Sequence, residues 1–450
     1  MSFSDELARS LQLNRVSRRQ ALWLLGAGSL GAAGVSLQGC ATSPVTGKNI
    51  LVGMSEAQER QVDAEVSPHQ FSTDLGAIQD GEINDYVSEV GRQLAEHSHR
   101  PQMPYSYRVL NANYVNAYTF PGGAMGLTRG IMTELEDEAE LAALLGHETG
   151  HVNARHAAQR QGSAMLAQAA VVGLAVATAD SKWGSLAGLG GTIGASALLA
   201  SYSRDNEREA DALGQEYMVR SGYPATGMVK LQQMLVDEEK RQPSLLETMF
   251  SSHPMSTERR NTARELAERR YADSNGRDVQ RERYMDNTAS LHKIKPTIEA
   301  CKRGETALAA KDYKKAEENF QDALKRTPDD YAANLRMAQC LQAQNKGKEA
   351  QQYASKAKAI YPQEAQAHKL SGVLSLSMHQ PDAAFASLNQ FDKLLPGDPG
   401  ITFLKGVALE GMGNRQAAAQ HYYSYLNMTQ QGDAARFSAQ RLQAWGYLRK

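Results

Sequence analysis

The chain has 450 residues, 42% of them hydrophobic, and a formal net charge of −1 at pH 7. These values suit a globular protein of two or more domains. The balanced charge, with no dense basic stretch interleaved with aromatic residues, excludes the electrostatic footprint of a nucleic-acid-binding protein, so no nucleic acid is expected among its partners.

The first 39 residues have the pattern of an export signal. Arg18 and Arg19 precede an apolar run over residues 21–37, which is short for a membrane span. The run ends in L-Q-G-C at residues 37–40, as in bacterial lipoproteins. Cleavage before Cys40 would free its thiol and amine for acylation, and several acyl chains anchor a protein stably. The stretch is predicted to be a lipoprotein signal peptide, with Cys40 as the lipidation site.

Other export routes stay open for this stretch. An ordinary cleaved signal and an uncleaved anchor helix are the alternatives, and residues 17–22 also resemble a twin-arginine export signal. Ala41, not Asp, follows the cysteine, which by the sorting rule of enterobacterial lipoproteins implies the inner leaflet of the outer membrane. Residues 40–54 are then expected to form a lipidated tether to a domain that begins near Ser55.

Short strands are predicted over residues 105–132, where apolar and polar residues alternate and Pro121-Gly122-Gly123 marks a hairpin turn. A free strand edge here would bind an extended peptide through its backbone, with loose sequence preference and a strong preference for unfolded chains. An ordinary packed hairpin is the alternative.

The stretch L-E-D-E-A-E-L-A-A-L-L-G-H-E-T-G-H, residues 135–151, is the centre of the sequence. Leu141, Leu144 and Leu145 recur at helical spacing, and Asp137 at the start can cap the first turn. A helix is therefore predicted, with its chemically reactive residues at the far end.

His147 and His151 lie one turn apart, so both imidazoles leave the same face and can bind one metal ion. A zinc ion lowers the pKa of a bound water toward about 7, and Glu148, which is not a ligand, is placed to take the water's proton. The alternative is a surface histidine pair. Gly146 and Gly150 argue against it, because each costs a helix interior about 1 kcal/mol relative to Ala and so indicates another backbone packed close by.

A catalytic zinc site needs a third protein ligand, with a fourth position left open to water. Residues 201–214 are predicted to form a helix on which Glu207 and Asp211 share a face while Glu209 points elsewhere. We predict that Glu207 is the third ligand to one Zn²⁺ per chain and that Asp211 accepts the second N–H of a ligating histidine. A solvated charged helix is the alternative.

These motifs resemble the gluzincin family of zinc peptidases, which includes HtpX and the periplasmic β-barrel assembly-enhancing protease. The matching residues are H-E-T-G-H at 147–151, E-R-E-A-D at 207–211, His253-Pro254 and Arg259. The resemblance covers roughly residues 45–270 and implies a zinc endopeptidase that acts in the quality control of envelope proteins. A similar N-A-F…P-G-G segment forms the strand facing the cleft in that family, which implies a substrate-binding edge strand made by Asn116, Ala117, Tyr118, Gly122 and Gly123.

Two nearly charge-free runs, residues 163–179 and 184–200, separate the predicted ligands. Each is at the lower limit for spanning a bilayer. They predict either a buried helical hairpin or a lid over the cleft that also touches membrane or an apolar client.

His253 lies in a predicted loop, and three roles for it stay open. It can stabilise the developing oxyanion, occupy the position of the water and hold the enzyme inactive, or serve only the structure. Tyr202 is a weaker candidate for the oxyanion role, with core packing as its alternative.

A 34-residue repeat typical of tetratricopeptide repeats begins at residue 297. Small residues recur where paired helices touch, and prolines recur where each second helix ends. The residues in register are Gly304, Ala338, Gly372 and Gly406, then Ala316, Ala350, Ala384 and Ala418, and then Pro328, Pro362 and Pro396. Such a stack presents a concave surface to protein partners.

The chain has three cysteines. With Cys40 assigned to lipid, Cys301 and Cys340 remain in neighbouring repeats of a domain predicted to lie in an oxidising compartment. They either form a disulfide or stay as two buried thiols, because spacing alone cannot distinguish the two.

The predicted fold is α+β and mostly α. A zincin-type metallopeptidase domain with a small β-sheet, residues 55–270, is followed by a linker over 271–296 and an all-α solenoid of four tetratricopeptide repeats over 297–432, which a helix in 433–450 caps. The predicted protein is a periplasmic zinc endopeptidase, lipid-anchored to the outer membrane. It would degrade misfolded or stalled envelope proteins, while the repeat groove recruits clients or the outer-membrane assembly machinery. The alternative is a chaperone or scaffold for outer-membrane protein assembly with little or latent proteolysis.

Overall fold

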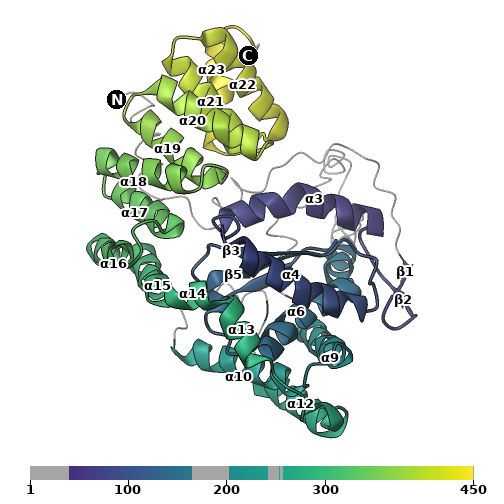
Figure 1. The fold of residues 1–450 in the computed structure, drawn as a ribbon. Coiled ribbons are helices and arrows are strands. Elements are labelled where there is room, and N and C mark those ends of the chain that lie inside the picture. The colour runs from purple at the N-terminus through teal and green to yellow at the C-terminus, as the bar shows by residue number, and fades with distance from the viewer. Residues whose placement is uncertain (1–39, 165–201, 242–252, 254–256, 449–450) are drawn as a thin grey trace. The chain divides into compact units, whose positions relative to one another are not determined.

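The structure is a computed structural model that describes residues 40–164, 202–241, 253 and 257–448 (Figure 1). They form two compact units, one made by the described residues up to Lys295 and one from Pro296 onward. The first unit combines helices with two small sheets and the second is helical, so the predicted α+β, mostly α fold is confirmed.

The first unit begins with a two-stranded antiparallel sheet, β1 (Ala41–Thr42) and β2 (Asn49–Ile50). The N–H of Gly53 then donates to the carbonyl oxygen of Ala158 at 2.8 Å, and Val52 and Met54 on either side are buried. This differs from the tether predicted for residues 40–54. The apolar side chains of this segment gain more from burial in the unit than from extension into water.

A three-stranded sheet lies at the centre of the unit, in the order β3–β5–β4. β5 pairs in parallel with β3 and in antiparallel with β4, so the hairpin predicted at Pro121-Gly122-Gly123 is confirmed. The elements of this region are α3 (Glu56–Thr73), α4 (Gly81–Glu96), β3 (Ser106–Leu110), β4 (Ala117–Thr119), β5 (Ala124–Thr128) and α5 (Arg129–Met132).

β4 is an edge strand whose outward backbone groups are unpaired among the described residues. Phe120 donates its N–H to Ala124, and Thr128 donates its N–H to Asn116, across the hairpin. Because hydrogen-bonded and non-hydrogen-bonded pairs alternate in an antiparallel ladder, the N–H and C=O groups of Ala117 and Thr119 point away from β5.

The predicted central helix is α6 (Glu138–Asn153), and all its residues are buried. Asp137 caps it by accepting a hydrogen bond from the N–H of Glu140 at 3.0 Å. Three further helices of the unit are α9 (Arg204–Arg220), α10 (Thr226–Arg241) and α12 (Thr257–Arg269). Leu141, Leu144 and Leu145 lie in the core with the sheet and with residues of α4, α9 and α10.

The stretch predicted as a linker over residues 271–296 is folded onto the first unit up to Lys295. It contains a 3₁₀ turn, η2 (Ala272–Ser274), and two short helices, α13 (Arg281–Asn287) and α14 (Ala289–Lys293). Tyr284 and Leu291 are buried in the core, and the Tyr284 hydroxyl donates to the carbonyl oxygen of Met132 at 2.5 Å. The prediction of a linker is therefore wrong, because these two buried side chains stand in a mostly polar sequence.

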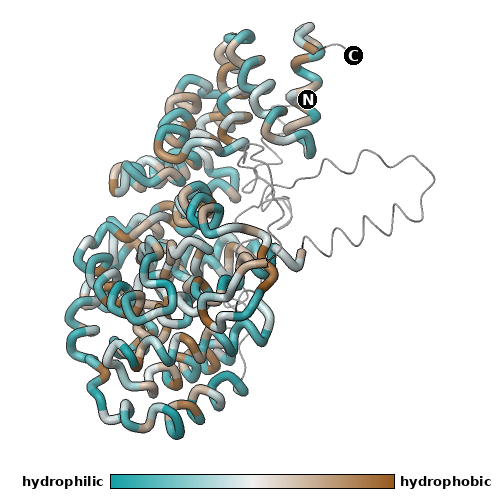
Figure 2. Tube along the Cα trace, turned by 90° about the vertical axis from the view of Figure 1, so that its right-hand side faces the viewer, coloured by the Kyte–Doolittle hydropathy of each residue, from teal (hydrophilic) through white to brown (hydrophobic). Residues whose placement is uncertain are grey.

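The second unit is a succession of helix pairs, as the repeat predicts. The pairs are α15 (Lys295–Ala309) with α16 (Tyr313–Arg326), α17 (Tyr331–Ala343) with α18 (Gly347–Ile360), α19 (Ala365–Ser377) with α20 (Pro381–Leu394), and α21 (Pro399–Gly411) with α22 (Arg415–Met428), followed by α23 (Asp433–Ala444). Figure 2 shows polar and apolar residues alternating along these helices, as expected for helices with one buried face.

The small residues of the repeat are required by the side chain that faces them. A Cβ added to Gly304 would lie 2.5 Å from the ring of Phe320, and one added to Gly406 would lie 2.7 Å from that of Tyr422. Each glycine thus makes room for a large side chain on the second helix of its own pair.

The sequence left open whether Cys301 and Cys340 form a disulfide and whether part of the chain contacts a membrane. Cys301 and Cys340 are both buried thiols, and no disulfide joins them. Among the described residues, no helix has the length and apolarity to cross a membrane. The predicted signal at residues 1–39 lies outside the described residues, as do the apolar runs of residues 163–200 apart from their first two residues.

The turn inside each helix pair places one residue in the left-handed region, at 34-residue intervals. Lys311, Asn345, His379 and Gly413 have φ values of 61°, 63°, 57° and 78°. A residue other than glycine is destabilised by about 1–2 kcal/mol in this region. Glycine avoids that strain but loses more conformational entropy on folding, which offsets part of its advantage.

We therefore predict that His379→Gly stabilises the third pair by about 0.5–1 kcal/mol, because the exposed side chain of His379 is lost at no cost to packing. Gly413→Ala should destabilise the fourth pair by about 1 kcal/mol, since a Cβ there meets no atom within 4 Å and only the backbone conformation is strained. Hydrogen–deuterium exchange should slow in α19 and α20 in the first variant and quicken in α21 and α22 in the second. Equal exchange in all three proteins would contradict the prediction.

Candidate metal centre

The helices α6 and α9 pack with their backbones in close contact, and together they carry the site (Figure 1). A Cβ added to Gly146 would lie 2.9 Å from the carbonyl oxygen of Gly214, and one added to Gly150 would lie 2.8 Å from that of Ala210. The prediction that another backbone packs against these two glycines is confirmed. The partner is α9, the helix that carries Glu207 and Asp211.

Four buried side chains bring one possible ligand atom each to within 4.8 Å of one another: His147, His151, Glu207 and His253. The Nε2 atoms of His147 and His151 are 3.1 Å apart, and oxygens of Glu207 lie 3.6 Å and 3.3 Å from them. Ligand atoms about 2.0–2.1 Å from a tetrahedral ion are about 3.3 Å apart. The three predicted ligands are thus brought together at the spacing that zinc requires.

The hydrogen-bonding partners of His147 support the same conclusion. Its Nδ1 lies 2.9 Å from Oδ1 of Asp211, and a carboxylate oxygen only accepts. His147 therefore carries its proton on Nδ1 and directs the Nε2 lone pair at Nε2 of His151. Two facing imidazole nitrogens beside a carboxylate need a positive charge between them, and this is the donor set of a catalytic zinc site.

Burial and neighbouring charges set the protonation of the ligands. Burial lowers the pKa of His151 well below its usual value, so the ring is a neutral ligand. Burial also opposes the ionisation of Glu207, but the facing His253 and His151 outweigh it and hold the pKa of Glu207 well below its ordinary range. Glu207 is therefore a carboxylate.

Glu148 has the environment of a base and not of a ligand. It is buried, its Oε1 lies 3.9 Å from Nε2 of His253, and its Oε2 has no hydrogen-bond partner among the described residues. Burial raises the pKa of Glu148, which increases the affinity of its carboxylate for a proton.

Arg259, which the sequence marks only as part of a motif, bridges Glu207 and Asp211 of α9. Its guanidinium lies 2.7 Å from Oε2 of Glu207 and donates at 2.7 Å to each oxygen of Asp211. Gln232 donates to Oδ1 of Asp211 at 2.9 Å as well. Gln232 belongs to α10, and no local sequence pattern links it to the site. Sequence reasoning therefore missed it.

His253 occupies the fourth corner of the cluster. Its Nδ1 lies 3.4 Å from Nε2 of His147 and 3.1 Å from Oε1 of Glu207. These separations match those among the other three ligand atoms. The geometry therefore favours a position on the ion over a position on the developing oxyanion.

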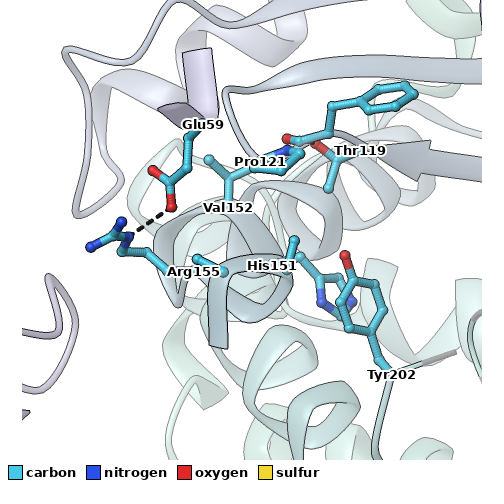
Figure 3. A pocket seen from close by; sticks show the side chains of 10 residues that line it. Glu59, Thr119, Pro121, His151, Val152, Arg155 and Tyr202 are labelled. Atoms are coloured by element: carbon cyan, nitrogen blue, oxygen red, sulfur yellow. Dashed lines mark hydrogen bonds and ion pairs between the residues drawn. The ribbon is translucent and has the colours of Figure 1, made fainter. Parts of the chain in front are cut away.

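Tyr202 and the end of β4 border the centre on another side. The ring of Tyr202 stacks on that of His151 with centroids 4.0 Å apart. Thr119 and Pro121 line a small pocket together with His151 and Tyr202 (Figure 3). The edge of the sheet is thus adjacent to the second histidine of the motif, while Tyr202 packs against that histidine.

The other residues of the predicted edge strand hold the hairpin in place. The N–H of Gly122 donates to Oδ1 of Asp63 at 2.7 Å, and Gly123 has φ +100°. The Tyr118 hydroxyl donates to Oδ2 of Asp74 at 2.6 Å. These contacts fix the position of β4 and leave its outward backbone groups unused.

Comparison with known proteins agrees with both units. Residues 82–267 match peptidase family M48, and residues 307–374 match the tetratricopeptide repeat. The β-barrel assembly-enhancing protease of Yersinia pestis is 30% identical over 226 residues, which are 48% of this chain and 46% of that protein. That of Escherichia coli strain K12 is 28% identical over 234 residues, 50% of this chain and 47% of that protein. Metalloprotease LoiP of the same strain is 31% identical over 172 residues, which are 38% of this chain and 64% of that protein. The chain spans about half the length of the two assembly-enhancing proteases.

We predict that Arg259→Met destabilises the first unit by about 3–5 kcal/mol in the absence of metal, because it leaves two buried carboxylates without their cation. Arg260→Met is the matched control. Its guanidinium donates to Gln233 and Asn261 near the surface, so its effect should stay within about 0.5 kcal/mol. Chemical denaturation in the presence of a chelator measures both, and equal stability of the two variants would contradict the assignment.

Proposed function

Because residues 82–267 are a domain of peptidase family M48, we propose that this chain is a zinc-dependent metalloendopeptidase. The observation that carries the proposal is the cluster of four ligand atoms within 4.8 Å of one another, with the unpartnered carboxylate oxygen of Glu148 beside it.

A zinc ion at this position would polarise the scissile carbonyl and acidify the attacking water. His147, His151 and Glu207 would hold it, and Asp211 keeps the proton of His147 on Nδ1. Glu148 would accept the proton of the attacking water and deliver it to the departing amine. Arg259 pairs with both Glu207 and Asp211, and it holds the pKa of the buried Asp211 carboxyl below its ordinary value.

The substrate is an extended peptide paired with β4. The outward N–H and C=O groups of Ala117 and Thr119 have no hydrogen-bond partner among the described residues, and Thr119 lines the small pocket beside His151. A strand held by its backbone supplies little sequence preference, so unfolded chains are the substrate class.

The setting of this activity is the periplasmic face of the outer membrane, with the chain anchored by lipid at Cys40. The exposure of Cys40 ahead of β1 and the lipoprotein pattern at residues 37–40 support the anchor. Misfolded or stalled envelope proteins are the clients, and the repeat groove recruits them or the outer-membrane assembly machinery. The repeats and the names of the two assembly-enhancing proteases support this part of the proposal.

A chaperone or scaffold with latent proteolysis is the second candidate. The observation that favours it is the position of His253, which competes with the attacking water for the fourth corner of the cluster.

Two variants distinguish the proposed role of Glu148 as a base from that of Glu207 as a metal ligand. Glu148→Gln should keep zinc and fold but lose proteolysis, since it removes a base and no ligand. Glu207→Ala should lose zinc as well, because one of three permanent ligands is gone. Metal analysis and digestion of casein on the same samples measure both effects. Full zinc occupancy in Glu207→Ala, or undiminished cleavage by Glu148→Gln, would refute the assignment.

His253→Ala tests the resting position of that side chain. If His253 occupies the fourth corner, its removal opens the position to water, and the rate of cleavage of an unfolded substrate should rise at unchanged zinc content. A histidine that supported the oxyanion would instead give a loss of about 10²- to 10³-fold in kcat. Reduced activity at full zinc occupancy therefore rules out latency through this residue.

Cys40→Ser tests the anchor. The variant should leave the membrane fraction, because acyl burial is the only anchor proposed for this chain. Sedimentation of wild type and variant from cell extracts makes the comparison. A variant that still sediments with membranes would move the anchor to the apolar runs of residues 163–200.

A further inference from the structure

The two histidines of the HExxH motif have different outer partners. His147 meets a carboxylate directly, through its 2.9 Å contact with Asp211. The Nδ1 of His151 instead lies 2.9 Å from Nδ1 of a second histidine, His156, whose Nε2 lies 3.2 Å from Oε2 of Glu209. His156 is buried, whereas the Glu209 side chain is 39% exposed.

Only one direction of these hydrogen bonds is compatible with a metal on His151. The carboxylate of Glu209 accepts, so Nε2 of His156 carries a proton. Nδ1 of a neutral His156 is then an acceptor, and His151 must donate from its own Nδ1. This leaves the lone pair of His151 on Nε2, the atom that faces His147 and Glu207.

The backbone after α6 is shaped to bring His156 back to His151. α6 ends at Asn153, and Arg155 adopts φ +59°, so that a new helical stretch starts at residue 156. The buried guanidinium of Arg155 donates to Oε1 of Glu59 at 2.7 Å and to the carbonyl oxygen of Met54 at 2.8 Å. These bonds hold a residue other than glycine in the left-handed region (Figure 3).

We propose that His156 and Glu209 are positioning residues for the metal centre, which fix the Nδ1–H tautomer and the ring orientation of His151. The inference rests on the zinc function proposed above. Glu209 lies on a different side of α9 from Glu207, yet acts on the same centre through His156. The two ligating histidines are then both oriented by carboxylates of one helix, one directly and one through an intervening imidazole.

Zinc affinity of the full chain, measured by chelator competition, tests the proposal. His156→Leu, which removes the acceptor, should weaken zinc binding about 10- to 100-fold. His156→Asn places an amide oxygen near the position of Nδ1 and should recover most of that loss. Glu209→Ala should weaken binding without changing the melting temperature of the zinc-free protein, since its side chain is partly exposed. Asp205→Ala, an exposed acidic position on the same helix, is the control and should bind zinc like wild type.

A second readout does not need metal. Nitrogen-15 NMR of histidine-labelled, zinc-free chain should show His151 as the Nδ1–H tautomer in wild type and a shift toward Nε2–H in His156→Leu. An Nε2–H tautomer in wild type, or equal zinc affinity in His156→Leu and wild type, would overturn the proposal. Equal losses in the Leu and Asn variants would assign His156 a packing role only and overturn it as well. If wild type binds no zinc, the proposed function fails, and the tautomer measurement still decides the role of His156.

Discussion

The close approach of α6 and α9 is the constraint on which the site depends. Glycines at 146, 150 and 214 let the two backbones meet where any side chain would lie under 3 Å from a neighbouring backbone atom. Each glycine costs a helix about 1 kcal/mol relative to Ala. Because the helices are this close, the side chains of Glu207 and Asp211 reach the imidazoles of α6 directly. A larger residue at any of these positions would separate the carboxylates from the histidines and remove the spacing of about 3.3 Å that a tetrahedral ion needs.

Charge compensation is the second requirement that this packing imposes. Glu148, Glu207 and Asp211 are all buried within one cluster, and burial alone would drive each to take up a proton. Arg259 meets Glu207 and Asp211 with a planar fork that satisfies both carboxylates at once. Glu148 is left outside this pairing, and its pKa is raised where that of Asp211 is lowered. The same cluster thus contains carboxylates fixed as anions and one that is able to exchange a proton.

The sequence predicted those parts of the molecule that leave a periodic or local pattern. Helical spacing placed His147 and His151 on one face, and the 34-residue register located the helix pairs. The linker prediction failed because Tyr284 and Leu291 are buried residues within a mostly polar stretch, so average composition conceals them. Gln232 and the contact of Glu209 with His156 could not be predicted, since each joins elements distant in the chain and neither belongs to a recurring motif.

Occupation of the fourth corner and compensation of the buried charge fall to two different residues, His253 and Arg259. His253 and Arg259 both contact Glu207, but Arg259 lies within α12 while His253 precedes that helix. Arg259 is tied to Asp211 by two hydrogen bonds and to Glu207 by an ion pair, so its position does not depend on where His253 lies. A displacement of His253 would therefore open the fourth corner while the carboxylates keep their cation. Removal of His253, as in the proposed test of latency, would thus leave Glu207 and Asp211 each paired with Arg259, so that no buried carboxylate lacks a cation.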